Sequence, residues 1–113
     1  VAEHTAAAFG ATCTFEFRRN YPPTINHPAE TEFARRVMQD LVGQDKVHEF
    51  DPTMGAEDFS YYGQRVPACY IVLGTYREGA PVHPLHSPHF DFNDEAIATG
   101  VMAMCAMALA PTN

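Results

Sequence analysis

A segment with a histidine between two prolines runs directly into the long apolar stretch that begins near Ala96. The segment PLHSPHFDFNDE, residues 84–95, places His86 midway between these prolines. Each proline fixes its own φ angle, so the backbone around the histidine is stiff. Asn93 then offers a helix N-cap before the apolar run of residues 96–110, and acidic residues follow it in the first turn, where the helix dipole favours them. We therefore expect a stiff loop at the mouth of a buried helix, presenting the His86 imidazole to a metal ion.

The composition fits one globular domain of modest size. The chain has 113 residues, of which 46% are hydrophobic and 19% charged, so it can form a core and is not disordered. Its formal net charge is -7 and its basic residues are scattered, which argues against a nucleic-acid partner. The apolar run of residues 96–110 is too short to span a bilayer, so we expect no membrane partner.

Cysteine usage favours a reducing, cytoplasmic compartment. Cys13, Cys69 and Cys105 are odd in number, widely spaced and without a CxxC motif, so we interpret them as small buried hydrophobic residues. No signal peptide is visible, and the start at Val1 without Met is expected for a processed or excised piece.

Hydrophobic spacing predicts helices alternating with strands. Residues 11–18 alternate apolar and polar side chains, as in a half-buried strand, and residues 67–74 form a nearly continuous apolar run, as in a strand buried on both faces. Residues 46–50 are a third, short strand candidate. Helices are predicted for the remaining periodic segments, which are residues 1–9, 27–43, 57–64 and 96–110. The predicted fold class is therefore α/β.

The best predicted helix carries clear end signals. His27 stands at its N-cap, Pro28 at the first helical position and Glu30 at the capping-box position, while Gly43 closes it. The two prolines of the preceding connector, residues 21–26, interrupt any regular element, so we expect a domain boundary there.

A second candidate site is the loop MGAEDF, residues 54–59. Gly55 and the carboxylate of Glu57 lie where a loop opens into a short helix, whose free N–H groups can receive a substrate carboxylate or oxyanion. The alternative is a plain helix start, which composition alone favours because acidic residues are common in first turns. No GxSxG motif supports a serine nucleophile.

Two further histidines flank His86 in the long loop of residues 75–93, whose length is typical of functional loops. The spacing His83, His86, His89 could gather one metal ion, yet on a proline-rich loop the three rings need not converge. We expect His83 and His89 to be exposed to solvent and His86 to be the ligand.

Three segments of the chain resemble one known family. YPPTIN (residues 21–26), MGAEDFSY (residues 54–61) and LHSPHFDFNDE (residues 85–95) are similar, in order and spacing, to the hippurate hydrolase group of dinuclear-metal amidohydrolases, related to aminoacylase and carboxypeptidase G. The resemblance implies that residues 27–113 are the C-terminal part of a zinc-peptidase-like α/β catalytic domain. Residues 1–26 would then be the last helix and strand of an α+β lid and dimerisation domain.

The resemblance also implies a function. The parent reaction is hydrolysis of N-acyl (hippurate-like) amino acids by water activated by two divalent metal ions, zinc or manganese, in an enzyme that forms a homodimer through its lid. His86 falls on the family's last metal ligand, whereas Gly55, Glu57 and Asn26 are carried over only as candidates for binding substrate or supporting the metal ligands, and the resemblance does not fix the role of Asn26. No segment matches the other ligands or the catalytic glutamate of the family, so we assign no catalytic residue and expect the isolated chain to be inactive.

Two other readings stay open from the sequence. One is a self-contained α+β interaction or dimerisation module that uses residues 11–18 as a pairing edge and has no catalysis. The other is a low-affinity metal carrier built on the three loop histidines. An HxDxH-like segment in the coding sequence upstream of Val1 would decide for the enzyme.

Overall fold

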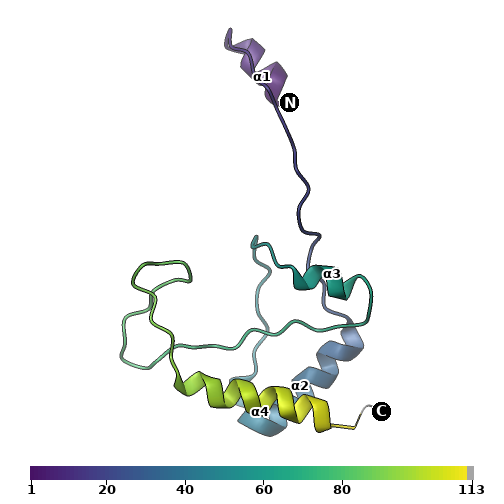
Figure 1. Ribbon diagram of the computed structural model, residues 1–113, viewed down its shortest axis with the longest axis vertical. Coiled ribbons are helices and arrows are strands. Elements are labelled where there is room, and N and C mark those ends of the chain that lie inside the picture. Colours follow the sequence, from purple (N-terminus) through teal and green to yellow (C-terminus); the bar gives the residue numbers. More distant parts are fainter. Residues whose placement is uncertain (112–113) are drawn as a thin grey trace.

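The computed structural model describes residues 1–111 and consists of helices joined by long extended segments (Figure 1). Each predicted helix is present, although the one expected at residues 57–64 is shorter than predicted. The helices are α1 (Ala2–Ala8), α2 (Pro28–Val42), the 3-10 turn η1 (Gln44–Lys46), α3 (Phe59–Gly63) and α4 (Glu95–Leu109).

The ends of α2 and α4 follow the sequence signals in part. His27 is the N-cap of α2, and Gly43 ends the helix with a φ angle of 95°, a conformation that residues with a Cβ atom rarely adopt. The capping box expected from Glu30 is absent, because α2 has no side-chain cap hydrogen bond. At α4 the N-cap is Asp94, one residue later than the expected Asn93, and it forms no side-chain cap hydrogen bond. The Asn93 Oδ1 atom nevertheless accepts a hydrogen bond from the N–H of Glu95, the first residue of the helix, at 3.2 Å.

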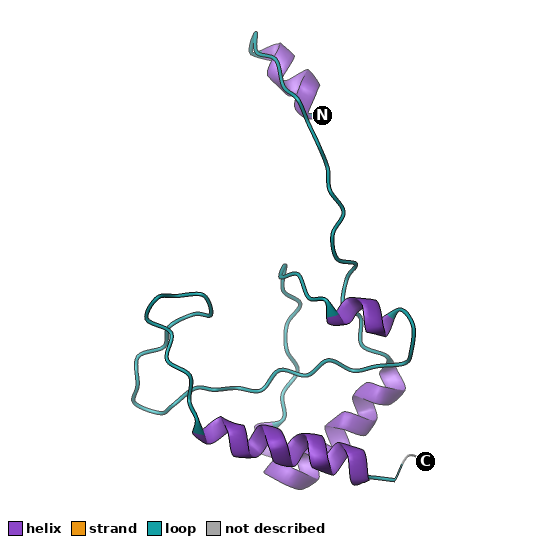
Figure 2. Ribbon diagram, viewed as in Figure 1, coloured by secondary structure: helices purple, strands orange, loops and turns teal. Residues whose placement is uncertain are grey.

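The predicted α/β fold is wrong, because residues 1–111 contain no β-strand (Figure 2). Residues 11–18 and 67–74 are extended but belong to no sheet, and residues 46–50 begin in η1 and continue irregularly. A strand exists only when its N–H and C=O groups pair with a neighbour. Within the described chain, residues 12–18 make no backbone hydrogen bond. The alternating pattern of residues 11–18 therefore indicates that these side chains suit a packed, pleated sheet, but the described chain provides no neighbouring strand for them.

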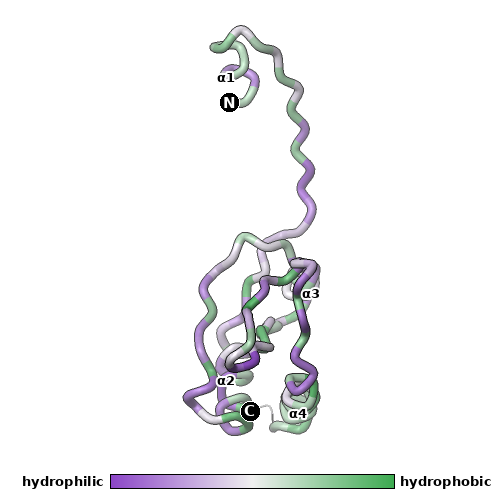
Figure 3. Tube along the Cα trace, turned by 90° about the vertical axis from the view of Figure 1, so that its left-hand side faces the viewer, coloured by the Kyte–Doolittle hydropathy of each residue, from purple (hydrophilic) through white to green (hydrophobic). Residues whose placement is uncertain are grey.

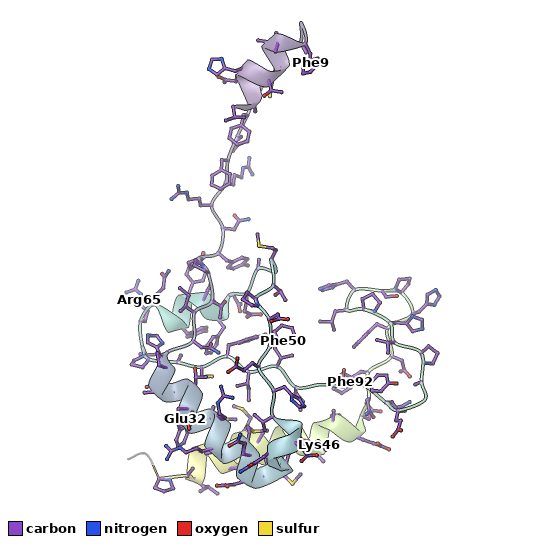
Figure 4. The ribbon with its side chains drawn as sticks, turned by 180° about the vertical axis from the view of Figure 1, so that it is seen from behind. Phe9, Glu32, Lys46, Phe50, Arg65 and Phe92 are labelled. Carbon is purple, nitrogen blue, oxygen red and sulfur yellow. The ribbon has the colours of Figure 1, made fainter. Side chains whose placement is uncertain are left out.

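Helix α1 and the extended residues 11–20 form an arm that points away from the rest of the molecule (Figure 1). Phe9 lies near its far end, with 85% of its surface exposed (Figure 4). The arm is fixed at its base, where the Tyr61 hydroxyl of α3 donates to the Asn20 carbonyl at 2.6 Å and the Tyr21 and Tyr61 rings lie 5.7 Å apart. The domain boundary expected at residues 21–26 stays a prediction.

The core is small and lies where α2 packs against α4. The buried apolar residues among those described are all alanines, Ala34, Ala96 and Ala103. The expectation of a buried C-terminal helix is wrong: α4 is apolar along its length (Figure 3), yet it exposes large side chains. These are Ile97, Val101, Met102, Met104 and Leu109.

The surface of the chain is larger than that of a compact protein of its mass. It exposes 9862 Å², whereas a folded monomer of 12.5 kDa exposes about 6,200 Å². Its radius of gyration is 19.9 Å, against about 13 Å for a compact domain of this length. Much apolar surface that other folded chains bury is thus exposed to solvent here.

The expectation of three buried cysteines is wrong for the same reason. Cys13 and Cys105 are exposed, Cys69 is half-buried, and all three are free thiols. None of the helices found between residues 1 and 111 has the length and apolar character needed to cross a membrane.

Candidate functional site

Asn26 holds the backbone of Tyr70 with both ends of its amide. Its Nδ2 atom donates to the Tyr70 carbonyl at 2.8 Å, and the Tyr70 N–H donates to its Oδ1 atom, also at 2.8 Å. His27 repeats the pattern one residue on: its N–H donates to the Ala68 carbonyl at 3.0 Å, and the Ala68 N–H donates to its Nδ1 atom at 3.1 Å. These four bonds form what we call the clasp, which ties the start of α2 to residues 68–70.

The Tyr70 side chain connects the clasp to Glu57. The Tyr70 hydroxyl donates to Glu57 Oε2 at 3.1 Å, and the N–H of Phe59 donates to Glu57 Oε1 at 3.1 Å. Hydrogen bonds from the Phe59 N–H first, then from Asp58 and Tyr70, lower the pKa of Glu57. The bond to Glu57, followed by burial, raises the pKa of the Tyr70 hydroxyl. The pair therefore holds an ionised carboxylate beside a protonated phenol at neutral pH.

The structure thus brings Asn26 and Glu57 together through Tyr70 but leaves Gly55 apart from them. The nearest atom that a Cβ at Gly55 would meet is Thr53 Oγ1, at 3.8 Å. Helix α3 begins at Phe59, two residues later than the sequence suggested, and Glu57 already occupies the N–H of Phe59. This first donor of the helix is consequently not free to receive a substrate oxyanion.

His86 lies in a turn within the long loop of residues 75–93. Its φ angle is 68°, and no other non-glycine residue between 1 and 111 has a positive φ. A turn bounded by Pro84 and Ser87 produces this conformation, since the Ser87 N–H donates to the Pro84 carbonyl at 3.1 Å. The imidazole is exposed and makes no hydrogen bond to the described part of the chain.

The base of the same loop is closed by one arginine. The Arg77 guanidinium lies 3.8 Å from an Asp91 carboxylate oxygen and donates to Asn93 Oδ1 at 3.4 Å. These contacts bring the two sides of the loop together, with His83 on one side and His89 on the other. As expected, both histidines are exposed to solvent, but their ring centroids are only 5.6 Å apart.

The described residues do not form a complete catalytic metal centre. From residue 1 to 111, no three side chains of His, Cys, Asp or Glu are grouped as ligands of one ion. Catalytic zinc sites use about three protein ligands and keep one position open. His86 could serve as one such ligand, because its ring makes no hydrogen bond to the described residues. The described residues alone, however, do not hold the two metal ions that the resemblance implies.

Three residues of these sites were not singled out from the sequence. Tyr70 lies inside the apolar run of residues 67–74, and the only signal was that a tyrosine hydroxyl needs a polar partner. His27 was interpreted only as an N-cap, whereas its ring accepts a hydrogen bond from Ala68. Arg77 is one basic residue in a loop of mixed composition, and nothing in the sequence places it against Asp91.

Comparison with known proteins identifies the class. Residues 2–110 match the sequence model described as Peptidase family M20/M25/M40, so the chain belongs to this family. This confirms the resemblance to metal-dependent amidohydrolases seen in three segments.

Two relatives are named hydrolases of related kinds. Thermostable carboxypeptidase 1 of Saccharolobus solfataricus is 36% identical over 107 residues, which are 93% of this chain and 26% of the relative. IAA-amino acid hydrolase ILR1-like 4 of Arabidopsis thaliana is 35% identical over 89 residues, which are 78% of this chain and 20% of the relative. The chain thus spans about a quarter of the length of such relatives. No solved structure matches it significantly.

Proposed function

We propose that this chain contributes one metal ligand and part of the substrate-binding surface to a metal-dependent amidohydrolase that cleaves N-acyl amino acids. Membership of the M20/M25/M40 family supports peptidase or amidohydrolase chemistry. The names of two relatives, an IAA-amino acid hydrolase and a carboxypeptidase, support hydrolysis of an amide bond next to an amino acid.

The observation that carries the proposal is the conformation of His86. A residue with a Cβ atom in the left-handed region costs about 1–2 kcal/mol, and such strain is concentrated at functional sites. His86 adopts a φ angle of 68° and is exposed, and neither ring nitrogen forms a hydrogen bond with the described residues. One nitrogen is then available to a metal ion, and the other to a partner that orients the ring.

Each candidate residue has a separate task in this proposal. The ions, when bound, polarise the amide carbonyl and make the attacking water more acidic. His86 supplies a neutral imidazole ligand, and the ionised Glu57 carboxylate accepts a hydrogen bond from the substrate on the side opposite to Tyr70. Asn26 positions Tyr70 through the clasp. Gly55, which has no side chain, lets a substrate approach the backbone of the loop before α3 closely.

The finer features of the proposal concern substrate, metal and assembly. The substrates are hippurate-like N-acyl amino acids, and the metal ions are zinc or manganese. The complete enzyme is a homodimer joined through residues 1–26, whose exposed aromatic side chains Phe9, Phe15 and Phe17 suit an interface. The proposed compartment is the cytoplasm, which fits three free thiols. The general base and remaining ligands lie outside the described residues, so the chain alone is inactive.

A chimeric enzyme tests the proposal. The segment of thermostable carboxypeptidase 1 that matches this chain is replaced by it, and hydrolysis of N-acyl amino acids is measured with zinc or manganese present. The chimera is expected to hydrolyse the substrate, and His86→Ala is expected to lower kcat/KM more than about 100-fold, because changing even a partner of a metal ligand costs 10–100-fold. The matched control is His48→Ala, which removes another exposed imidazole and should leave the rate unchanged.

Two results contradict the proposal. One is an inactive chimera that folds normally by circular dichroism. The other is equal activity of the His86→Ala and His48→Ala chimeras, which would show that the His86 imidazole takes no part in the reaction.

A further inference from the structure

The long loop brings together two imidazoles that the proposed catalytic site does not use. His83 lies before the turn that carries His86, and His89 lies after it. The loop closes on itself through Arg77, which pairs with Asp91 and donates to Asn93. The two imidazole rings then lie with centroids 5.6 Å apart and an angle of 46° between their planes.

We propose that His83 and His89 form a binding site for one divalent transition-metal ion, separate from the site to which His86 belongs. Two imidazoles on one ion, each with a metal–nitrogen bond of about 2.0–2.1 Å, place their ring centroids about 5–6 Å apart. The observed separation of 5.6 Å lies within this range. Imidazole nitrogen is a preferred ligand for zinc, copper and nickel, and not for magnesium or calcium.

The surroundings of the two rings leave space for the ion. Both line an open cavity of about 300 Å³, together with Asp91 and the Phe90 and Tyr76 side chains. The pair of Arg77 and Asp91 is close to neutral in charge, so the guanidinium presents little net repulsion to a cation. Three ligands do not converge within residues 1–111, so water molecules fill the other coordination positions.

The backbone holds both histidines before any ion binds. The loop contains Pro81, Pro84 and Pro88, each of which fixes one φ angle and lowers the entropy lost on ordering. The His89 N–H donates to Ser87 Oγ at 3.1 Å, which fixes the backbone on that side of the turn. His86 does not line the cavity. The cavity thus brings together His83 and His89 without the His86 imidazole.

Zinc titration of the 113-residue chain followed by calorimetry tests this inference. The unaltered chain is expected to bind one Zn²⁺ ion at this site, and His83→Ala and His89→Ala should each weaken binding at least tenfold, because each removes one of two protein ligands. His48→Ala is the matched control, since it removes another exposed imidazole, and its affinity should stay within twofold of the unaltered chain. Circular dichroism establishes that each variant retains the helix content of the parent.

A second measurement needs no variant. Diethyl pyrocarbonate modifies exposed imidazoles, and peptide mass spectrometry locates the modified residues. Zn²⁺ is expected to protect His83 and His89 in the unaltered chain and to leave His86 and His48 reactive. The inference is overturned if the chain binds no Zn²⁺, if His83→Ala binds it as tightly as the parent, or if Zn²⁺ protects His86 instead. These outcomes are independent of the chimera, in which loss of activity on His86→Ala tests the proposed function alone.

Discussion

Replacement of His86 by glycine separates the catalytic importance of this residue from its contribution to stability. The φ angle of 68° is unfavourable for histidine and natural for glycine. Relief of this strain stabilises the folded chain by about 1–2 kcal/mol. The greater freedom of glycine in the unfolded chain offsets this by about 0.5–1 kcal/mol. Because the ring is exposed and makes no hydrogen bond to the described residues, no packing term is lost.

The expected result of His86→Gly is therefore a stable but inactive enzyme. The free energy of unfolding should be unchanged or higher by up to about 1.5 kcal/mol. In the chimera described above, kcat/KM should fall more than about 100-fold, because a metal ligand is lost. Thermal denaturation and hydrolysis of an N-acyl amino acid, measured on the same preparation, give both numbers.

Leu85→Gly is the matched control, since Leu85 is exposed and its φ angle is not positive. This change should lower the free energy of unfolding by about 0.5–1 kcal/mol and leave hydrolysis intact, which is the opposite combination. The reasoning is refuted if His86→Gly retains activity, or if it destabilises the enzyme as much as Leu85→Gly does.

Three further predictions concern the clasp, the carboxylate and the exposed surface. Asn26→Ala removes two hydrogen bonds and should lower the free energy of unfolding by about 1–3 kcal/mol in urea denaturation; Asn20→Ala, which keeps the Asn20 carbonyl that Tyr61 uses, should have no comparable effect. Because the pKa of Glu57 is lowered in the folded chain, its ionisation stabilises the fold above its unfolded pKa and ceases to do so as the pH falls through the folded pKa. Tyr70→Phe raises that folded pKa toward its ordinary value, so acid unfolding should begin at a higher pH than in the parent, and an unchanged acid transition would contradict this. The isolated chain should self-associate in size-exclusion chromatography because of its excess apolar surface, and a compact monomer with cooperative melting would argue against that view.

The helices were predictable because their signals are local. Pro28 and Gly43 act on the backbone at their own positions, and Asn93 acts on an N–H two residues away. These effects need no distant partner, so the bounds of α2 and α4 agree closely with the predicted segments. The stiff turn around His86 was predictable for the same reason.

Local signals could not show that the predicted strands would lack a pairing neighbour, nor which loops would contact each other. A strand depends on a neighbour, and the pattern of residues 67–74 specifies a preference without specifying the partner. In the described chain these residues are held by the Asn26 side chain and by the backbone N–H and ring of His27, which lie more than 40 positions away from Tyr70 and Ala68. The proximity of His83 and His89 likewise depends on Arg77, whose pairing with Asp91 has no local signature.

The clasp depends on an asparagine, and this residue can deamidate as the protein ages. Asparagine is among the thermolabile residues, since its amide hydrolyses slowly to a carboxylate. At Asn26 this reaction would replace the Nδ2 atom, which donates a hydrogen bond to the Tyr70 carbonyl, by a negatively charged oxygen. That oxygen and the Tyr70 carbonyl oxygen would then face each other near the former bond length of 2.8 Å. A single covalent change without any mutation would therefore loosen residues 68–70 from α2, and aged preparations should gain one negative charge as they lose this attachment.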